Sequence, residues 1–166
     1  MKKLYDDLVE QIILGILLNN NNYYDKIVDL IYPTDFFHET HQKIFITLEN
    51  LIQKNQLANA VIVSNYTPEV ESEYICNLAK DFIPPDNLLD YIRVLKELSQ
   101  KRKLYNISDY IEKHLHNIDI KEQIEKIEQL IYNIHLKDEK TTVKFYEGTK
   151  QIIEYIKDIQ EEDHRH

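Results

Sequence analysis

Glycine is almost absent from this chain, since only Gly15 and Gly148 occur in 166 residues. Loops that cradle phosphate groups need clustered glycines, because their backbone amides must approach the anion without an intervening Cβ. The sequence contains neither a Gly-x-x-x-x-Gly-Lys-Ser/Thr loop nor a Gly-x-Gly-x-x-Gly turn. We therefore expect no nucleotide hydrolysis by this chain itself, and we expect it to act through its surfaces.

Cysteine and long apolar runs are equally scarce. Cys76 is the only cysteine, which excludes an internal disulfide framework and fits a reducing compartment such as the cytoplasm. The longest apolar stretch, residues 12–18, is far shorter than the ~20 residues that span a membrane, so no membrane association is expected. The N-terminus, Met1-Lys2-Lys3-Leu4, soon turns acidic at Asp6-Asp7, which is not typical of a signal peptide.

Basic residues are outnumbered by acidic ones. The chain has 20 Lys and Arg against 29 Asp and Glu, which gives a net charge of −9. An acidic domain repels the phosphate backbone, so we expect no direct sequence-specific nucleic-acid binding by this chain alone. The one basic run, residues 101–103, is interpreted as a solvated helix face.

The predicted fold class is all-α. Apolar residues recur with the 3.6-residue period of amphipathic helices, and only four prolines interrupt them. The pattern predicts helices over residues 5–18, 24–31, 39–54, 71–80 and 88–116. Residues 60–63 have strand propensity, but no partner strand is visible, so we predict a short helix or an irregular segment. Pro84-Pro85 marks the predicted end of a helical globule over residues 1–83.

Two apolar stripes follow this boundary. The first consists of Leu88, Tyr91, Ile92, Leu95, Leu98, Ile107 and Ile111. The second runs from Ile120 through Ile124, Ile127, Ile131 and Ile134, with gaps of 4, 3, 4 and 3 residues that are typical of a coiled-coil seam. The short connection between the stripes predicts a long antiparallel helical hairpin over residues 84–136. One hairpin cannot bury both of its apolar faces, so we expect it to dimerise with a second copy of the chain.

A last amphipathic segment lies near the C-terminus. Residues 137–142 are polar and are predicted to form a flexible connector, followed by a detached linker helix over residues 143–166. The apolar stripe of this helix consists of Phe145, Ile152, Ile156 and Ile159. Because this stripe is separated from the globule, we expect it to dock on a domain that is absent from the chain.

Five short motifs occur in a characteristic order. They are Glu10-Gln11-Ile12-Ile13-Leu14-Gly15-Ile16-Leu17-Leu18; Pro33-Thr34-Asp35-Phe36-Phe37; His41 with Ile44-Phe45; Pro84 and Asn87 with Tyr91-Ile92-Arg93-Val94-Leu95; and Arg102-x-Leu104. Together they resemble the opening helix, the Pro-x-Asp-Phe turn, the His-x-x-Ile-Phe motif and the Pro-x-x-Asn helix start of the DnaB-type replicative DNA helicases. The resemblance covers about residues 10–160 and rests on the order and separation of the motifs rather than on any single one.

The resemblance implies a helical globule, a hairpin and a linker helix that leads to a RecA-like ATPase domain. In that family, N-terminal domains pair through their hairpins and form a collar of three dimers above a hexameric motor. The linker helix docks on the motor domain of the neighbouring subunit, and the collar receives the C-terminal domain of primase. The implied function is therefore ring assembly and primase docking during DNA replication in a bacterial-type cytoplasm, and a helicase loader is a further candidate partner.

The chain departs from the family pattern in two respects. The segment between Gln56 and Ser72 is shorter than is typical, and the ATPase domain is absent. We therefore expect this chain to be a fragment of an ATP-dependent helicase that unwinds duplex DNA. ATP and Mg²⁺ belong to the missing domain, and no cofactor is expected in this one.

The individual motif residues are interpreted as structural. They are Gly15, Pro33, Asp35, Phe36, His41 and Phe45. Gly15 is interpreted as a close helix contact and His41 as a histidine that hydrogen-bonds the backbone at a helix start. His38 and His41 are three residues apart, but no cysteine nearby completes a zinc site, so no metal is expected. No catalytic residue is expected either, because paired carboxylates such as Asp6-Asp7 lack convergent geometry.

Three alternatives remain open. The first is the helicase-binding C-terminal domain of a primase, which is also helical, although Pro33–Phe37 and the His41 motif favour the helicase. The second is another helical adapter or oligomerisation module. The third is a small enzyme that uses His38, His41 or nearby carboxylates, for which the sequence shows no convergent site.

Overall fold

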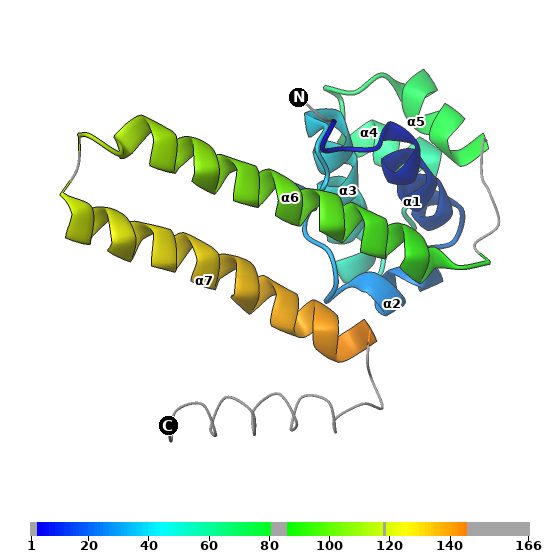
Figure 1. Ribbon diagram of the computed structural model, residues 1–166. Helices are drawn as coiled ribbons and strands as arrows, with labels where there is room; N and C mark the ends of the chain where they lie inside the picture. Colours follow the sequence, from blue (N-terminus) through cyan, green and yellow to red (C-terminus); the bar gives the residue numbers. More distant parts are fainter. Residues whose placement is uncertain (1–2, 81–85, 118, 146–166) are drawn as a thin grey trace. The chain divides into compact units, whose positions relative to one another are not determined.

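The computed structural model describes residues 3–80, 86–117 and 119–145, and every regular element in these ranges is helical, as predicted (Figure 1). The elements are α1 (Asp7–Asn19), η1 (Asn21–Tyr23), α2 (Tyr24–Ile27), η2 (Pro33–Asp35), α3 (Glu39–Gln53), α4 (Ala60–Tyr66), α5 (Ser72–Lys80), α6 (Leu88–His114) and α7 (Ile120–Phe145). The chain divides into two compact units, Met1–Asn117 and Ile118–His166, and each is described by itself.

Helix α1 is the centre of the first unit and contacts α3, α5 and α6 (Figure 1). Its second half is apolar all round, and every residue from Ile13 to Leu18 is buried. Side chains from the surrounding helices complete the core, among them Ile44, Phe45, Leu48, Ile75 and Ile92, all fully buried. Burial of a large apolar side chain contributes about 1.5–3 kcal/mol. The apolar run in the N-terminal sequence therefore forms part of the core that stabilises this unit.

Gly15 lies where α1 and α5 approach most closely. A Cβ added at this position would lie 2.6 Å from the carbonyl oxygen of Leu78, a distance that real Cβ atoms do not tolerate. The backbone of α5 cannot yield as a flexible side chain would. Gly15 therefore permits a helix contact that any other residue would push apart, despite a cost of about 1 kcal/mol in helix propensity.

Side-chain caps fix the ends of several helices. Asp6 accepts a hydrogen bond from the Val9 amide at the start of α1, and Asn59 accepts one from the Ile62 amide at the start of α4. Asn55 ends α3 with a positive φ of 58°, a conformation that asparagine tolerates better than most residues. The cap at Asn59 explains why the strand-prone residues 60–63 begin a helix.

Two asparagines, one at the end of α1 and one just after it, connect this helix to distant segments. The side-chain Nδ2 of Asn19 donates hydrogen bonds to the carbonyl oxygens of Gly15 and Ala79, at 2.8 and 2.9 Å. The Asn21 side chain donates to the Ala58 carbonyl at 3.0 Å and accepts from the Ala58 amide at 2.9 Å. These bonds hold the chain reversal after α1 against α5 and against the start of α4.

The structure corrects two predicted boundaries. Helix α6 belongs to the first unit, which ends at Asn117, so the main division does not fall at residues 84–85. The predicted flexible connector at residues 137–142 lies inside α7, which continues to Phe145. Lys and Glu are good helix formers, and no glycine or proline occurs between Ile120 and Phe145, so polarity alone does not end this helix.

No helix among the described residues is long and apolar enough to cross a membrane.

Candidate interaction surface

A buried carboxylate organises the polar centre of the first unit. Glu10 on α1 is only 1% exposed, and it accepts hydrogen bonds from the amide of Phe37 at 2.8 Å and from Nδ1 of His41 at 2.8 Å. These bonds satisfy the carboxylate, whose burial without partners would be costly. Glu10 thereby fixes the turn before α3 against α1.

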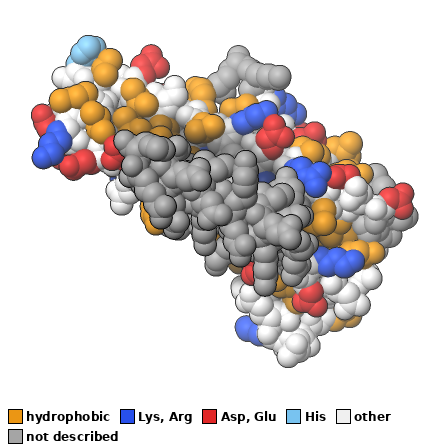
Figure 2. All heavy atoms as spheres, turned by 60° about the horizontal axis from the view of Figure 1, so that its bottom comes forward, with side chains coloured by type: hydrophobic (Ala, Val, Ile, Leu, Met, Phe, Trp, Pro, Cys, Tyr) orange, Lys and Arg blue, Asp and Glu red, His pale blue; other side chains and the backbone are white. Residues whose placement is uncertain are grey.

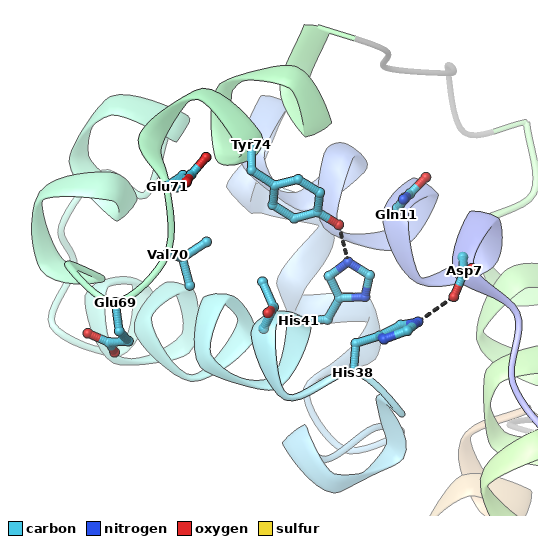
Figure 3. A pocket seen from close by; sticks show the side chains of 9 residues that line it. Asp7, Gln11, His38, His41, Glu69, Val70, Glu71 and Tyr74 are labelled. Carbon is cyan, nitrogen blue, oxygen red and sulfur yellow. Dashed lines mark hydrogen bonds and ion pairs between the residues drawn. The ribbon is translucent and has the colours of Figure 1, made fainter.

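His41 connects this centre to α5. Its Nε2 lies 2.5 Å from the hydroxyl of Tyr74, and the two rings stack with centroids 5.9 Å apart (Figure 3). Burial, as the main cause, raises the pKa of Tyr74 above its ordinary value. The partners of His41 are thus two side chains, not the backbone groups expected from its position at a helix start. Both ring nitrogens are engaged in holding three helices together.

His38 lies beside His41 but engages a different acid. Its Nε2 forms a hydrogen bond with a carboxylate oxygen of Asp7 (Figure 3). This bond is the main cause that lowers the pKa of Asp7, and Lys3, whose Nζ lies 3.6 Å from the carboxylate, adds to it. Asp7 therefore stays ionised at neutral pH.

A cavity of about 520 Å³ opens beside this group (Figure 3). Its lining consists of Asp7, Gln11, His38, Thr40, His41, Glu69, Val70, Glu71 and Tyr74. His38 and His41 are both committed to carboxylates, and among the described residues no group of three or more His, Cys, Asp or Glu could hold a metal ion. The geometry of this cavity therefore supports a structural interpretation of both histidines.

A second buried carboxylate, that of Asp35, connects η2 to α6 through hydrogen bonds. Asp35 is fully buried and accepts from Nζ of Lys96 at 3.0 Å, from Oγ of Ser99 at 2.7 Å and from the amide of Tyr32 at 2.8 Å. Lys96 and Ser99 are themselves 3% and 2% exposed. Sequence reasoning identified Asp35 but missed its partners. The helical spacing of α6 could have indicated that these two polar residues are buried. Lys96 and Ser99 follow the apolar Ile92 by four and seven residues, so they lie on the same face of the helix.

The structure divides the predicted interface stripe of α6 into two parts. Leu88, Ile92 and Leu95 are 6%, 0% and 2% exposed, on a helix half that contacts α1 and η2. These three side chains are core residues of a single chain, which revises the expectation that they lie between copies. Tyr91, Leu98 and Ile111 are partly exposed, and Ile107 is buried.

The distal half of α6 and helix α7 expose large apolar side chains. They are Leu104, Tyr105 and Leu115 on α6 and Ile120, Ile124, Ile131 and Tyr132 on α7. Ile124 and Ile131 are 49% and 40% exposed, while Ile127 and Ile134 are half-buried. Figure 2 shows hydrophobic side chains at the surface among charged ones. We call Ile124, Ile127, Ile131 and Ile134 the α7 seam.

The predicted docking stripe of the linker helix is largely outside the described part of the chain. Phe145 is the last residue of α7, and Ile152, Ile156 and Ile159 lie outside the described residues. This prediction therefore stays a prediction.

The structure defines an all-helical domain with a packed globule and helices that expose apolar residues. The family model described as the DnaB-like helicase N terminal domain matches residues 2–97. More than half of the chain is thus covered, and the chain belongs to this family.

Individual relatives agree with the family model. The chain is 28% identical over 136 residues to the replicative DNA helicase DnaB of Rickettsia conorii, and the match covers 75% of this chain and 28% of that protein. It is 22% identical over 135 residues to the replicative DNA helicase DnaB of Pasteurella multocida, covering 75% and 29%. The chain thus corresponds to little more than a quarter of the length of these relatives.

A solved structure has the same fold. The crystal structure of the N-terminal domain of DnaB helicase from Mycobacterium tuberculosis superimposes with a TM-score of 0.71 at 19% sequence identity. The superposition covers 80% of this chain and 99% of that one.

Proposed function

We propose that this chain is the N-terminal collar domain of a hexameric replicative DNA helicase. In this function it assembles the ring through contacts between copies and receives primase during DNA replication. The parent protein would unwind duplex DNA with ATP and Mg²⁺ in a domain that this chain lacks. The family membership of residues 2–97 carries the proposal, because the relatives are named as replicative DNA helicases.

The distribution of exposed apolar residues supports assembly through the helices after the globule. Ile120, Ile124 and Tyr132 are 62%, 49% and 60% exposed, whereas the core of the first unit excludes solvent. Large exposed apolar patches mark interaction sites in soluble proteins. The α7 seam has the 3, 4, 3 spacing that a facing helix can fill with its own side chains.

The polar residues of the globule support a structural rather than a catalytic function. Glu10 and His41 form a hydrogen bond with each other, and Asp35 forms an ion pair with Lys96. A catalytic site would need a nucleophile or base that is free to meet a substrate. A docking module therefore fits the described residues better than a small enzyme.

Isothermal titration of this chain against the C-terminal domain of the cognate primase tests the docking function. Saturable heat is expected with this domain, and none with the catalytic domain of the same primase, which serves as the matched control. If the chain gives no saturable heat with the C-terminal domain of primase, or equal heat with the two primase domains, the docking part of the proposal fails.

A further inference from the structure

A second cavity of the first unit has a chemistry unlike the rest of the molecule. It has a volume of about 630 Å³ and is lined by Lys3, Leu4, Tyr5, Phe37, Arg102, Tyr105 and Asn106. This volume lies in the range of small-ligand and peptide side-chain pockets. Among the described residues that line it, the charged ones are Lys3 and Arg102, which are both cationic, although the chain as a whole has a net charge of −9. We call it the Arg102 cavity.

The guanidinium of Arg102 lies at the wall of this cavity and donates hydrogen bonds to two backbone oxygens of the described residues. Nη1 donates to the carbonyl of Leu4 at 2.8 Å, and Nη2 donates to the carbonyl of Asp35 at 2.6 Å. Among the described residues no carboxylate forms an ion pair with it. Burial lowers the pKa of Arg102, but guanidinium groups remain charged at neutral pH. A guanidinium has five N–H donors, and two acceptors among the described residues leave further N–H groups of Arg102 available to a ligand.

Aromatic rings form the other walls of the Arg102 cavity. Tyr5 and Phe37 stack with centroids 3.9 Å apart, and the guanidinium carbon of Arg102 lies 5.6 Å from the centroid of Phe37. Phe37 and Tyr105 are 44% and 47% exposed, although they are large apolar side chains. Lys3 lies over the ring of Tyr5, 4.5 Å from its centroid. Rings that are already stacked present a rigid apolar surface, so a ligand loses little entropy in ordering them.

We propose that the Arg102 cavity binds a short acidic peptide segment of a partner protein, with a carboxylate on Arg102 and an apolar side chain against Phe37 and Tyr105. Arginine binds carboxylates through parallel N–H donors, and aromatic residues with arginine are the usual anchors of peptide interfaces. The charge of the cavity is opposite to that of the protein around it. The cationic Arg102 and Lys3 would attract an acidic segment to this cavity, while the net charge of −9 disfavours its binding elsewhere, which gives the interaction its selectivity.

A peptide explains the cavity better than a nucleic acid. The cavity offers one partly buried guanidinium and one lysine at its edge, not the row of basic side chains that follows a phosphate backbone. The net charge of −9 would repel the phosphates outside the cavity. The described lining residues all belong to the first unit, and a peptide bound there goes beyond the proposed function.

Fluorescence anisotropy on the full chain tests the proposal. The probe is a fluorescein-labelled hexapeptide, Ser-Asp-Asp-Ser-Leu-Phe with a free C-terminal carboxylate. It is compared with its uncharged form, Ser-Asn-Asn-Ser-Leu-Phe with a C-terminal amide, and with a labelled oligothymidylate of twelve nucleotides. We expect saturable binding of the acidic peptide, at least about tenfold weaker binding of the uncharged peptide, and no saturable binding of the oligonucleotide.

Two exposed lining residues provide variants that spare the fold. Lys3→Glu and Tyr105→Ser should each weaken binding of the acidic peptide about tenfold. Their matched controls, Lys43→Glu and Tyr66→Ser, should leave it unchanged, because Lys43 also forms an i,i+4 ion pair and Tyr66 is also exposed, but neither lines the cavity. Arg102→Lys, which keeps the charge but not the planar fork, should also weaken binding.

Three results would overturn the proposal. They are equal binding of the charged and uncharged peptides, equal loss in the variants and their controls, and preferential binding of the oligonucleotide. Each would leave the proposed primase docking untouched, since that function is measured with a different ligand.

Discussion

The first unit and helix α7 both contain stripes of large apolar residues, but these stripes are buried in the first unit and exposed on α7. On α1, Ile13 and Leu14 are fully buried, whereas on α7 Ile124 and Ile131 are 49% and 40% exposed. Both helices have isoleucine-rich stripes at helical spacing. The comparison teaches that apolar periodicity predicts a helix and its apolar face, but it does not predict whether the same chain covers that face.

Helix α6 contains buried apolar residues in its first half and exposed ones in its second half. Its first half buries Ile92 and Leu95 in the first unit, and its second half exposes Leu104 and Leu115 by 55% and 51%. The polar residues follow the same division, since Lys96 is buried on Asp35 while Lys113 pairs with Asp109 at the surface. The transition from core to surface thus lies within α6, beyond Ser99.

Lys96→Ala should cause the largest loss of stability. It would leave the fully buried carboxylate of Asp35 without its closest cation, and removing one partner of a buried ion pair costs about 3–5 kcal/mol. Urea denaturation followed by circular dichroism measures the free energy of unfolding. Lys101→Ala, which removes an exposed lysine from the same helix, should change it by less than about 0.5 kcal/mol. Equal effects of the two variants would contradict the structural importance of the Asp35 cluster.

Gly15→Ala should destabilise the first unit by about 1–3 kcal/mol, the usual cost of overpacking. The new Cβ would lie 2.6 Å from the carbonyl oxygen of Leu78, which belongs to the backbone of α5. Thermal and urea denaturation measure the change. Asn50→Ala, at an exposed position of α3, is the control and should be neutral or slightly stabilising. A Gly15→Ala protein as stable as the parent would show that α1 and α5 do not approach this closely.

The ion pair of Asp7 should make a smaller, pH-dependent contribution. The pKa of Asp7 is lower in the folded chain than the ordinary pKa of an aspartate, so its stabilisation is fully present above that ordinary pKa and is lost as the pH falls through the lowered one. The free energy of unfolding of Asp7→Asn should therefore fall less than that of the parent between pH 5 and pH 3. Urea denaturation at both pH values measures this difference. If both proteins lose the same stability, the His38 contact does not act on Asp7.

The sequence allowed the all-α fold and most helices of the first unit to be predicted, because these helices bury one regular face. The partners of Asp35 and Glu10 were missed, since a buried ion pair depends on residues far apart in the chain, such as Asp35 and Lys96. The prediction of a connector at residues 137–142 is wrong because a polar composition does not by itself end a helix, and Lys and Glu in this segment are good helix formers. Whether a second copy covers the α7 seam cannot be read from one chain, so that interface stays a prediction.

Replacement of exposed isoleucines of α7 by aspartate should leave the stability of the first unit almost unchanged. This is the smallest change in stability among the predictions. Ile124→Asp combined with Ile131→Asp alters two exposed positions of α7. Surface substitutions outside special features usually change stability by less than about 0.5 kcal/mol. Leu57→Asp, at a 60% exposed position in the first unit, is the matched control.

Light scattering coupled to size-exclusion chromatography on these three proteins tests the central claim most directly. The account predicts dimers or larger assemblies for the parent and for Leu57→Asp, and monomers of 20.0 kDa for the Ile124→Asp, Ile131→Asp protein with unchanged helix content. A parent chain that remains monomeric at every concentration, or a double variant that assembles as the parent does, would contradict it.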